Sequence, residues 1–285
     1  MRQPEDTYTL DLLDQSSVTD PGASLPAASQ LVLSLFPGID LLGRGFENVG
    51  FSVVRGPDLI YGSDVRNFRT IPGRFDGVIG GSPCPDFSKA RRSAPTGVGL
   101  EMLGEFKRLV LEARPTWWLL ENVPGCPDVH IEGYGHQRID INASECGLPQ
   151  NRLRHFQFGH RHGYVITVER MPMLDAVESC CTASEGEAVE RRSWDRFCSL
   201  QGLAQPMHLP SFTLSARYRA VGNAVPLPMA EVFARAIVAA RPLDGFRLCV
   251  CRCGRPVSGK AVLATAACRK RMQRRRELAA VTVPA

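Results

Sequence analysis

The chain has 285 residues, of which 44% are hydrophobic and 22% charged, and its net charge is +5. This composition is typical of a globular protein, and it excludes a disordered acidic chain, a collagen and a coiled coil. No uninterrupted apolar run approaches the roughly 18 residues of a membrane span, and residues 1–30 lack the basic start and apolar run of a secretory signal. We therefore expect a cytoplasmic protein with no membrane partner.

Strands and helices are expected to alternate after a flexible leader, residues 1–30. Short apolar runs predict strands at 31–36, 51–56, 74–81 and 116–122. Apolar residues at helical spacing predict helices that end near Gly50 and that cover 101–113 and 226–240. The alternation implies an α/β fold whose parallel sheet carries helices on both faces. The chemistry of such sheets gathers at the carboxyl ends of the strands.

The first two strands end in residues that suit a ligand. Gly38 lies in a turn between a strand and a helix, where a missing side chain permits close approach. Such a turn is also common as a simple tight connection. Asp58 and Asp64 follow the second strand and are candidates for hydrogen bonds to a ribose or an adenine, or are surface carboxylates.

The third strand ends at Cys84, which stands between two prolines. This setting gives a rigid backbone and an exposed sulfur, as a nucleophile requires, although a packed thiol is the alternative. The basic side chains that follow would help to ionise the thiol and hold phosphate; they are Lys89, Arg91 and Arg92.

Three further motifs carry polar groups. Glu121 ends the buried strand at 116–122, where desolvation raises a carboxyl pKa so that the group can donate a proton; an ion pair or a helix cap is the alternative. Arg152 and Arg154 alternate in an extended segment and should point the same way, toward an anion or a carbonyl, or toward a structural salt bridge. Asn223 lies in a glycine turn that also suits a plain helix start.

The order of these motifs, FPG, PC, ENV, QxRxR and GNAVP, resembles the DNA cytosine-5 methyltransferase family over roughly residues 31–240. The amino-acid sequence around these motifs is more similar to the small phage and actinobacterial members of the family. The resemblance implies a Rossmann-like S-adenosylmethionine-dependent methyltransferase sheet and methyl transfer to C5 of cytosine in double-stranded DNA. It also implies catalytic roles for Cys84 as the nucleophile at C6, Glu121 at N3 and the exocyclic amine, and Arg154 near O2. Arg152 is expected to support the loop or a phosphate.

For the cofactor S-adenosylmethionine the resemblance implies eight residues, namely Phe36, Gly38, Asp58, Asp64, Pro83, Met102, Asn223 and Val225. Two positions depart from the family pattern. Asp40 stands where a glycine is usual, so the methionine end of the cofactor is expected to sit differently. Pro85 replaces the usual glutamine after the nucleophile, which is expected to affect base flipping or turnover.

The expected organisation is a catalytic and cofactor-binding domain (31–160), a short irregular target-recognition region (161–210), a return to the catalytic domain (211–244) and a tail (245–285). The tail holds ten basic residues and no acidic one from Arg247 to Arg276, which suits a polyanion-binding arm or a solvated tail. Its four thiols suit a structural zinc ion, but their spacing is unusual and free thiols are the alternative; they are Cys249, Cys251, Cys253 and Cys268.

Two other functions are compatible with these motifs. The same chemistry on tRNA fits a short recognition region and a basic tail. A non-catalytic DNA-binding regulator on the same scaffold would explain Asp40 and Pro85, although it would not explain why every chemical group remains. We expect a monomer.

Overall fold

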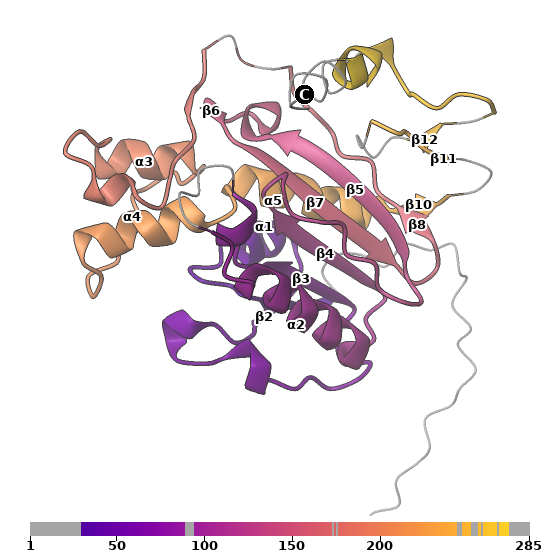
Figure 1. The fold of residues 1–285 in the computed structure, drawn as a ribbon, viewed down its shortest axis with the longest axis horizontal. Coiled ribbons are helices and arrows are strands. Elements are labelled where there is room, and N and C mark those ends of the chain that lie inside the picture. Colours follow the sequence, from indigo (N-terminus) through magenta and orange to yellow (C-terminus); the bar gives the residue numbers. More distant parts are fainter. Residues whose placement is uncertain are drawn as a thin grey trace, which may run out of the picture.

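A computed structural model describes residues 30–88, 94–172, 174, 176–243, 247–251, 256–257, 259–266 and 268–273. The predicted leader, the basic side chains at 89, 91 and 92, and Cys253 lie outside these residues. The core is a six-stranded sheet with the order β2-β1-β3-β4-β7-β5 (Figure 1). Its strands are β1 (Leu31–Leu35), β2 (Ser52–Arg55), β3 (Gly77–Gly81), β4 (Trp117–Asn122), β5 (Gly135–Asn142) and β7 (Leu153–His160).

Five strands of this sheet run in one direction, and β7 runs in the opposite direction. Strands β2, β1, β3 and β4 pair in parallel, as predicted. Strand β7 pairs antiparallel with both β4 and β5. The sheet is therefore mixed, and the expectation of a purely parallel sheet is wrong at this edge. The start of β7 consequently lies beside the end of β4, with Asn122 opposite His155.

Helices cover both faces of the sheet (Figure 1). Helices α1 (Leu41–Val49) and α5 (Leu227–Val238) cover one face, and α2 (Val98–Ala113) covers the other. Alternate strand residues serve the two faces because successive side chains of a strand point in opposite directions. In β4, Leu119 packs on the α5 side, whereas Trp118 and Leu120 pack on the α2 side.

Helices α1 and α5 touch where both carry small residues. A Cβ on Gly45 would lie 2.3 Å from the Cβ of Ala230, so a larger residue at position 45 would force the helices apart. Helix α1 follows β1 after a short turn, and its close packing against α5 fixes the direction of the chain beyond the carboxyl end of β1.

A second, smaller cluster lies beside the sheet. It is built from α3 (Trp194–Leu200) and α4 (Leu214–Asn223), with Phe197 and Tyr218 at its centre. The predicted boundaries differ from this arrangement at both ends. Ile166 and Val168, expected in the recognition region, belong to the sheet core, whereas α4, expected in the returning catalytic segment, packs with α3.

Short strand pairs complete the fold. Strand β6 (Gln150–Asn151) pairs with β9 (Glu178–Ser179), and β8 (Tyr164–Val165) pairs with β10 (Arg241–Pro242). A separate hairpin, β11 (Arg247–Leu248) with β12 (Pro256–Val257), lies at the C-terminal end, on the opposite side of the molecule from α3 and α4 in Figure 1.

Among the described residues, one segment is long and apolar enough to cross a membrane by length and composition, Leu214–Val238. It consists of α4 and α5, which are separate helices, and α5 buries Met229 and Phe233 against the sheet. These contacts are those of a core helix.

Candidate active site

The carboxyl ends of the parallel strands surround a cavity of about 550 Å³. The residues after β1, β2, β3 and β4 line it together with the start of β7 and the turn between α4 and α5. All the predicted catalytic and cofactor residues line this one cavity, namely Phe36, Gly38, Asp58, Asp64, Pro83, Cys84, Met102, Glu121, Arg152, Arg154, Asn223 and Val225. The sequence motifs therefore converge, although they are far apart along the chain.

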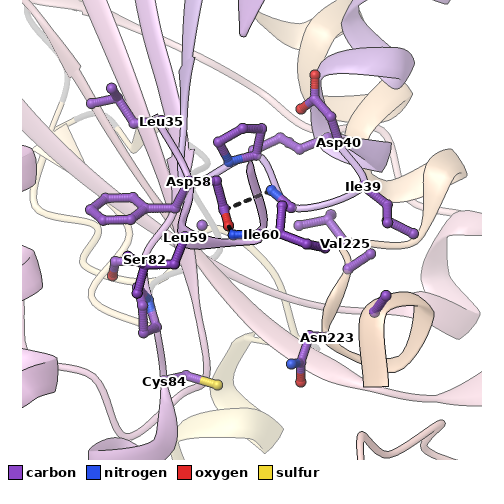
Figure 2. A pocket seen from close by; sticks show the side chains of 18 of the residues that line it. Leu35, Ile39, Asp40, Asp58, Leu59, Ile60, Ser82, Cys84, Asn223 and Val225 are labelled. Atoms are coloured by element: carbon purple, nitrogen blue, oxygen red, sulfur yellow. Dashed lines mark hydrogen bonds between the residues drawn. The ribbon is translucent and has the colours of Figure 1, made fainter. Parts of the chain in front are cut away.

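The turn after β1 is held by the segment that follows β2. Gly38 has a φ of 54°, a conformation that favours glycine, and a Cβ there would meet nothing within 4 Å. The Asp58 carboxylate accepts hydrogen bonds from Gly38 N at 2.8 Å and Ile60 N at 2.9 Å (Figure 2). Tyr61 Oη donates to Gly38 O at 2.7 Å. The glycine thus stays open to the cavity while its backbone is fixed.

Asp40 caps helix α1. Its carboxylate accepts from Gly43 N and from Ser34 Oγ, each at 2.9 Å, and lies 3.0 Å from Arg55 Nε. Burial raises the pKa of the Asp40 carboxyl even though these partners favour its charge. Figure 2 shows the carboxylate directed away from Cys84. The side chain expected to obstruct the cofactor path is therefore turned into a helix N-terminus.

Two side chains hold the loop that carries Cys84. The amide of Asn122 donates to Ser82 O at 3.1 Å and to Ser82 Oγ at 2.9 Å. The carboxylate of Asp86 accepts from Thr96 N and Gly99 N, each at 2.8 Å, which ties the loop to the start of α2. Figure 2 shows the Cys84 sulfur pointing into the cavity, toward the side on which Asn223 lies. The described residues on both sides of Cys84 are therefore anchored by hydrogen bonds.

The surroundings of the Cys84 sulfur favour its thiol form over the thiolate. Burial raises the pKa of the Cys84 thiol, and the negative charge of Glu121 raises it further, whereas Arg154 and Arg152 lower it by less. The predicted activation by a strongly electropositive setting is therefore not found among the described residues. The basic side chains expected to supply it, from Lys89 to Arg92, lie outside them.

Glu121 and Arg154 form an ion pair at the junction of β4 and β7. Arg154 Nε lies 3.1 Å from Glu121 Oε1, and the two side chains are only 15% and 10% exposed. Burial raises the pKa of the Glu121 carboxyl, and the two arginines only partly offset this effect. Its surroundings thus favour the protonated carboxyl more than water does, which is the direction predicted from its position.

Arg152 differs from Arg154 in its partners. Its guanidinium is buried and donates to three carbonyl oxygens, those of Cys181 at 2.8 Å, Gly222 at 2.8 Å and Ala224 at 3.0 Å. The expectation that both arginines point at one target is therefore wrong, because Arg152 precedes β7 and turns into the protein. Its expected support of a loop agrees with these contacts.

Several residues of the site were missed from the sequence. An apolar wall of the cavity is formed by Ile39, Leu59 and Ile60. Leu59 is 75% exposed, and large apolar side chains beside Asp58 are the signal that could have revealed this wall. Gln201 is buried and donates to Val221 O at 2.5 Å, which supports the turn before Asn223. A lone buried glutamine gives no comparable signal.

The predicted metal ligands lie elsewhere. Cys249, Cys251 and Cys268 come together in the C-terminal segment, away from the cavity lining, and Cys253 lies outside the described residues.

Comparison with known proteins shows what the chain is similar to. Residues 59–185, which include Cys84, Glu121 and Arg154, match the family model of C-5 cytosine-specific DNA methylases. This part of the chain is therefore similar to that family. It is 38% identical over 99 residues to the Type II methyltransferase M.HgiDI of Herpetosiphon aurantiacus, covering 31% of this chain and 32% of that protein. It is 28% identical over 167 residues to the Type II methyltransferase M.HindV of Haemophilus influenzae, covering 47% and 55%.

Solved structures agree with the fold of the C-5 cytosine-specific DNA methylases. A methyltransferase of Entamoeba histolytica, EhMeth, has a TM-score of 0.57 at 13% identity, covering 74% of this chain and 98% of that one. A putative prophage DNA modification methyltransferase from E. coli has a TM-score of 0.51 at 17% identity, covering 74% and 99%. The matched part of the chain spans about a third of the length of M.HgiDI and just over half of the length of M.HindV.

Proposed function

We propose that this protein transfers a methyl group from S-adenosylmethionine to C5 of cytosine in double-stranded DNA. The observation that carries this proposal is the convergence of Cys84, Glu121 and Arg154 on one cavity beside the glycine turn of β1. The match of residues 59–185 to the C-5 cytosine-specific DNA methylase model and the names of the two curated relatives support it. On this proposal the protein acts in the cytoplasm of a bacterial or phage-infected cell.

The cavity fits S-adenosylmethionine. Ile39, Leu59 and Ile60 offer an apolar surface for a flat heterocycle, and Asp58 ends the segment after β2 with oxygens that can accept from ribose hydroxyls. Gly38 leaves room for close approach of a ligand to the backbone. When bound, the cofactor supplies a methyl group on a positively charged sulfur.

The chain's own groups prepare the cytosine. The ring is a poor electrophile at C6 until N3 gains a proton, and the protonated form of Glu121 can donate it. The Cys84 thiol passes its proton to a base, and its sulfur forms a bond to C6 of the N3-protonated ring, which makes C5 electron-rich. After C5 is methylated and its proton is lost to a base, the bond from sulfur to C6 breaks and the ring recovers its aromaticity.

Arg154 orients Glu121 through its ion pair, and its guanidinium lines the same cavity. We assign it a role beside the O2 edge of the base. Arg152 is assigned a positioning role because its donors are committed to backbone carbonyls. The target atoms of cytosine are inaccessible in a stacked duplex, so the base has to be flipped out of the helix to reach the cavity.

The test is a covalent trap. A duplex that contains 5-fluorocytosine blocks the final elimination, so the protein with S-adenosylmethionine should form an adduct stable to denaturation, mapped to Cys84 by mass spectrometry. Cys84→Ser is the matched control and should form none while it retains cofactor affinity. Bisulfite sequencing of DNA from cells expressing the protein supplies target sequences for these duplexes. Absence of any adduct on those duplexes, or methyl transfer to tRNA alone, would overturn the proposal.

A further inference from the structure

The C-terminal segment brings three thiols together. Cys249 and Cys251 follow strand β11, and Cys268 lies on the helical residues 268–273. Their sulfur atoms all lie within 4.8 Å of one another, and the three residues are 4%, 0% and 2% exposed. This grouping joins residues from the two ends of the segment in one buried cluster.

The distances suit metal ligands better than a disulfide. The sulfur atoms of Cys249 and Cys251 are 3.4 Å apart, whereas a disulfide requires about 2.05 Å. Two thiolates on a tetrahedral zinc ion lie about 3.8 Å apart, given a zinc–sulfur bond of roughly 2.3 Å. The observed separations therefore bracket the spacing around a zinc ion.

Hydrogen-bond donors surround these sulfur atoms. Ala264 N donates to Cys249 Sγ at 3.2 Å, and Thr265 Oγ1 lies 3.1 Å from Cys268 Sγ. The guanidinium of Arg271 approaches Cys251 Sγ at 3.8 Å. Donors of this kind offset the negative charge of metal-bound thiolates and orient them.

Among the described residues of this segment, the remaining core is small. Apart from the three cysteines it contains Val257, with Leu263, Ala264 and Met272 packed against it. So few apolar side chains do not stabilise an independent unit, and small units of this kind depend on disulfides or metals. A metal ion would supply the missing folding free energy.

We propose that Cys249, Cys251 and Cys268 hold a structural zinc ion that folds the C-terminal segment. Buried thiolates in near-tetrahedral spacing favour zinc over hard cations such as magnesium or calcium. The folded segment presents Arg269 and Lys270 to solvent, and Arg271 Nη2 lies 3.9 Å from Glu145 Oε1 of the catalytic body. This site is independent of the proposed methyl transfer, since its residues do not line the cavity.

The test measures metal in the full-length protein after reconstitution with zinc under reducing conditions and removal of unbound metal. We expect about one zinc per chain, and about a tenth of that in Cys251→Ser and Cys268→Ser. Cys180→Ser, which changes a cysteine outside the cluster, should keep its zinc. Cobalt substitution should give the intense thiolate-to-metal absorption of a three-thiolate tetrahedral site.

A second measurement does not depend on the variants folding. Removing the metal with a chelator should increase hydrogen exchange in peptides covering 259–273 and leave those of α5 unchanged. Wild-type protein that binds no zinc under reducing conditions, or variants that keep it, would overturn the proposal. So would unchanged exchange after chelation. The 5-fluorocytosine adduct at Cys84 is a separate readout, so the two proposals can fail independently.

Discussion

Arg154 and Glu121 face each other across two antiparallel strands, with 3.1 Å between Arg154 Nε and Glu121 Oε1. The pair lies beside the Cys84 sulfur in one cavity. Its members act on the thiol in opposite directions, since the carboxylate raises the Cys84 pKa and the guanidinium lowers it. The charge state of Glu121 therefore controls how readily Cys84 becomes a nucleophile.

Glu121→Gln should make Cys84 more reactive and the enzyme less active. The change removes a negative charge that raises the Cys84 pKa and leaves Arg154 free to stabilise the thiolate. Alkylation of Cys84 by iodoacetamide, followed by peptide mass spectrometry at pH 7–9, should be several-fold faster, whereas methyl transfer should fall by about 10²–10⁴. Cys126, whose pKa is raised to about 12, is an internal control that should stay unreactive. Slower alkylation of Cys84 in the variant would contradict this coupling.

Arg152→Lys should mainly lower the stability of the protein, whereas Arg154→Lys should mainly lower the rate of methyl transfer. A lysine at 152 cannot reproduce the fork that binds three buried carbonyls, so the free energy of unfolding should fall by about 2–4 kcal/mol. A lysine at 154 should change the melting temperature little and reduce methyl transfer by roughly 10–100-fold. Thermal unfolding and turnover of the two variants, measured side by side, check both statements. Equal stability of Arg152→Lys and wild type would refute the buried clamp.

Asp40 and Gly43 should be energetically coupled. A Cβ at position 43 would lie 2.2 Å from Asp40 Oδ2, so Gly43→Ala should destabilise the protein, although alanine normally favours a helix. Asp40→Gly removes the carboxylate and tolerates the φ of 55° at this position. In that background Gly43→Ala should cost far less, with a coupling of about 1–3 kcal/mol in a double-mutant cycle measured by urea unfolding. Additive effects would show that the cap does not exclude the side chain.

Two buried histidines should make the fold sensitive to acid. Burial is the largest cause that lowers the pKa of His155 and of His160 to about 4 each, against 6.5 for the free group. The neutral forms are therefore kept in the folded state, and stability should fall as pH drops from about 6.5 toward 4. His160→Asn should reduce the slope of unfolding free energy near pH 5 by about 1.4 kcal/mol per pH unit. An unchanged slope in His160→Asn would contradict this explanation.

Arg269 and Lys270 should contribute to DNA binding through charge alone. Both are exposed and follow Cys268 directly. Arg269→Ala with Lys270→Ala should weaken binding to all duplexes alike and lower the salt dependence, log Kd against log salt, by up to about 2. Fluorescence anisotropy at several salt concentrations measures this slope. An unchanged slope would indicate that these side chains do not contact phosphate.

The parallel half of the fold could be predicted because its strands are continuous apolar runs. Strands β1 to β4 and helices α1 and α5 lie within a few residues of the predicted ranges. The antiparallel strands β5 and β7 were not predicted, since they bury polar side chains that hide the apolar pattern. Gln157, for example, is fully buried and bonds to Pro127 O and Val129 N.

The residues that form the site could be predicted from the sequence, but the hydrogen-bond and ion-pair partners of their side chains could not. The rule that chemistry gathers at strand ends placed Cys84 and Glu121 together, and the resemblance placed Arg154 with them. Neither the rule nor the resemblance predicted that Asp40 caps helix α1, because this role depends on the positions of Ser34 and Gly43 in three dimensions. The direction of the Arg152 side chain depends on backbone carbonyl oxygens of other segments, and a pattern of side chains in the sequence does not reveal their positions.

The buried guanidinium of Arg152 joins backbone from two distant stretches, at Cys181 and at Gly222 to Ala224, and Arg152 is two residues before Arg154 of the ion pair. Rotation of the α3–α4 cluster against the sheet would break these hydrogen bonds. It would leave the buried, charged guanidinium of Arg152 without partners, which is energetically costly. Whatever nucleic acid that cluster touches is therefore held at a fixed angle to Cys84. On the proposed function, the flipped base therefore reaches Cys84 without a rotation of this cluster against the sheet.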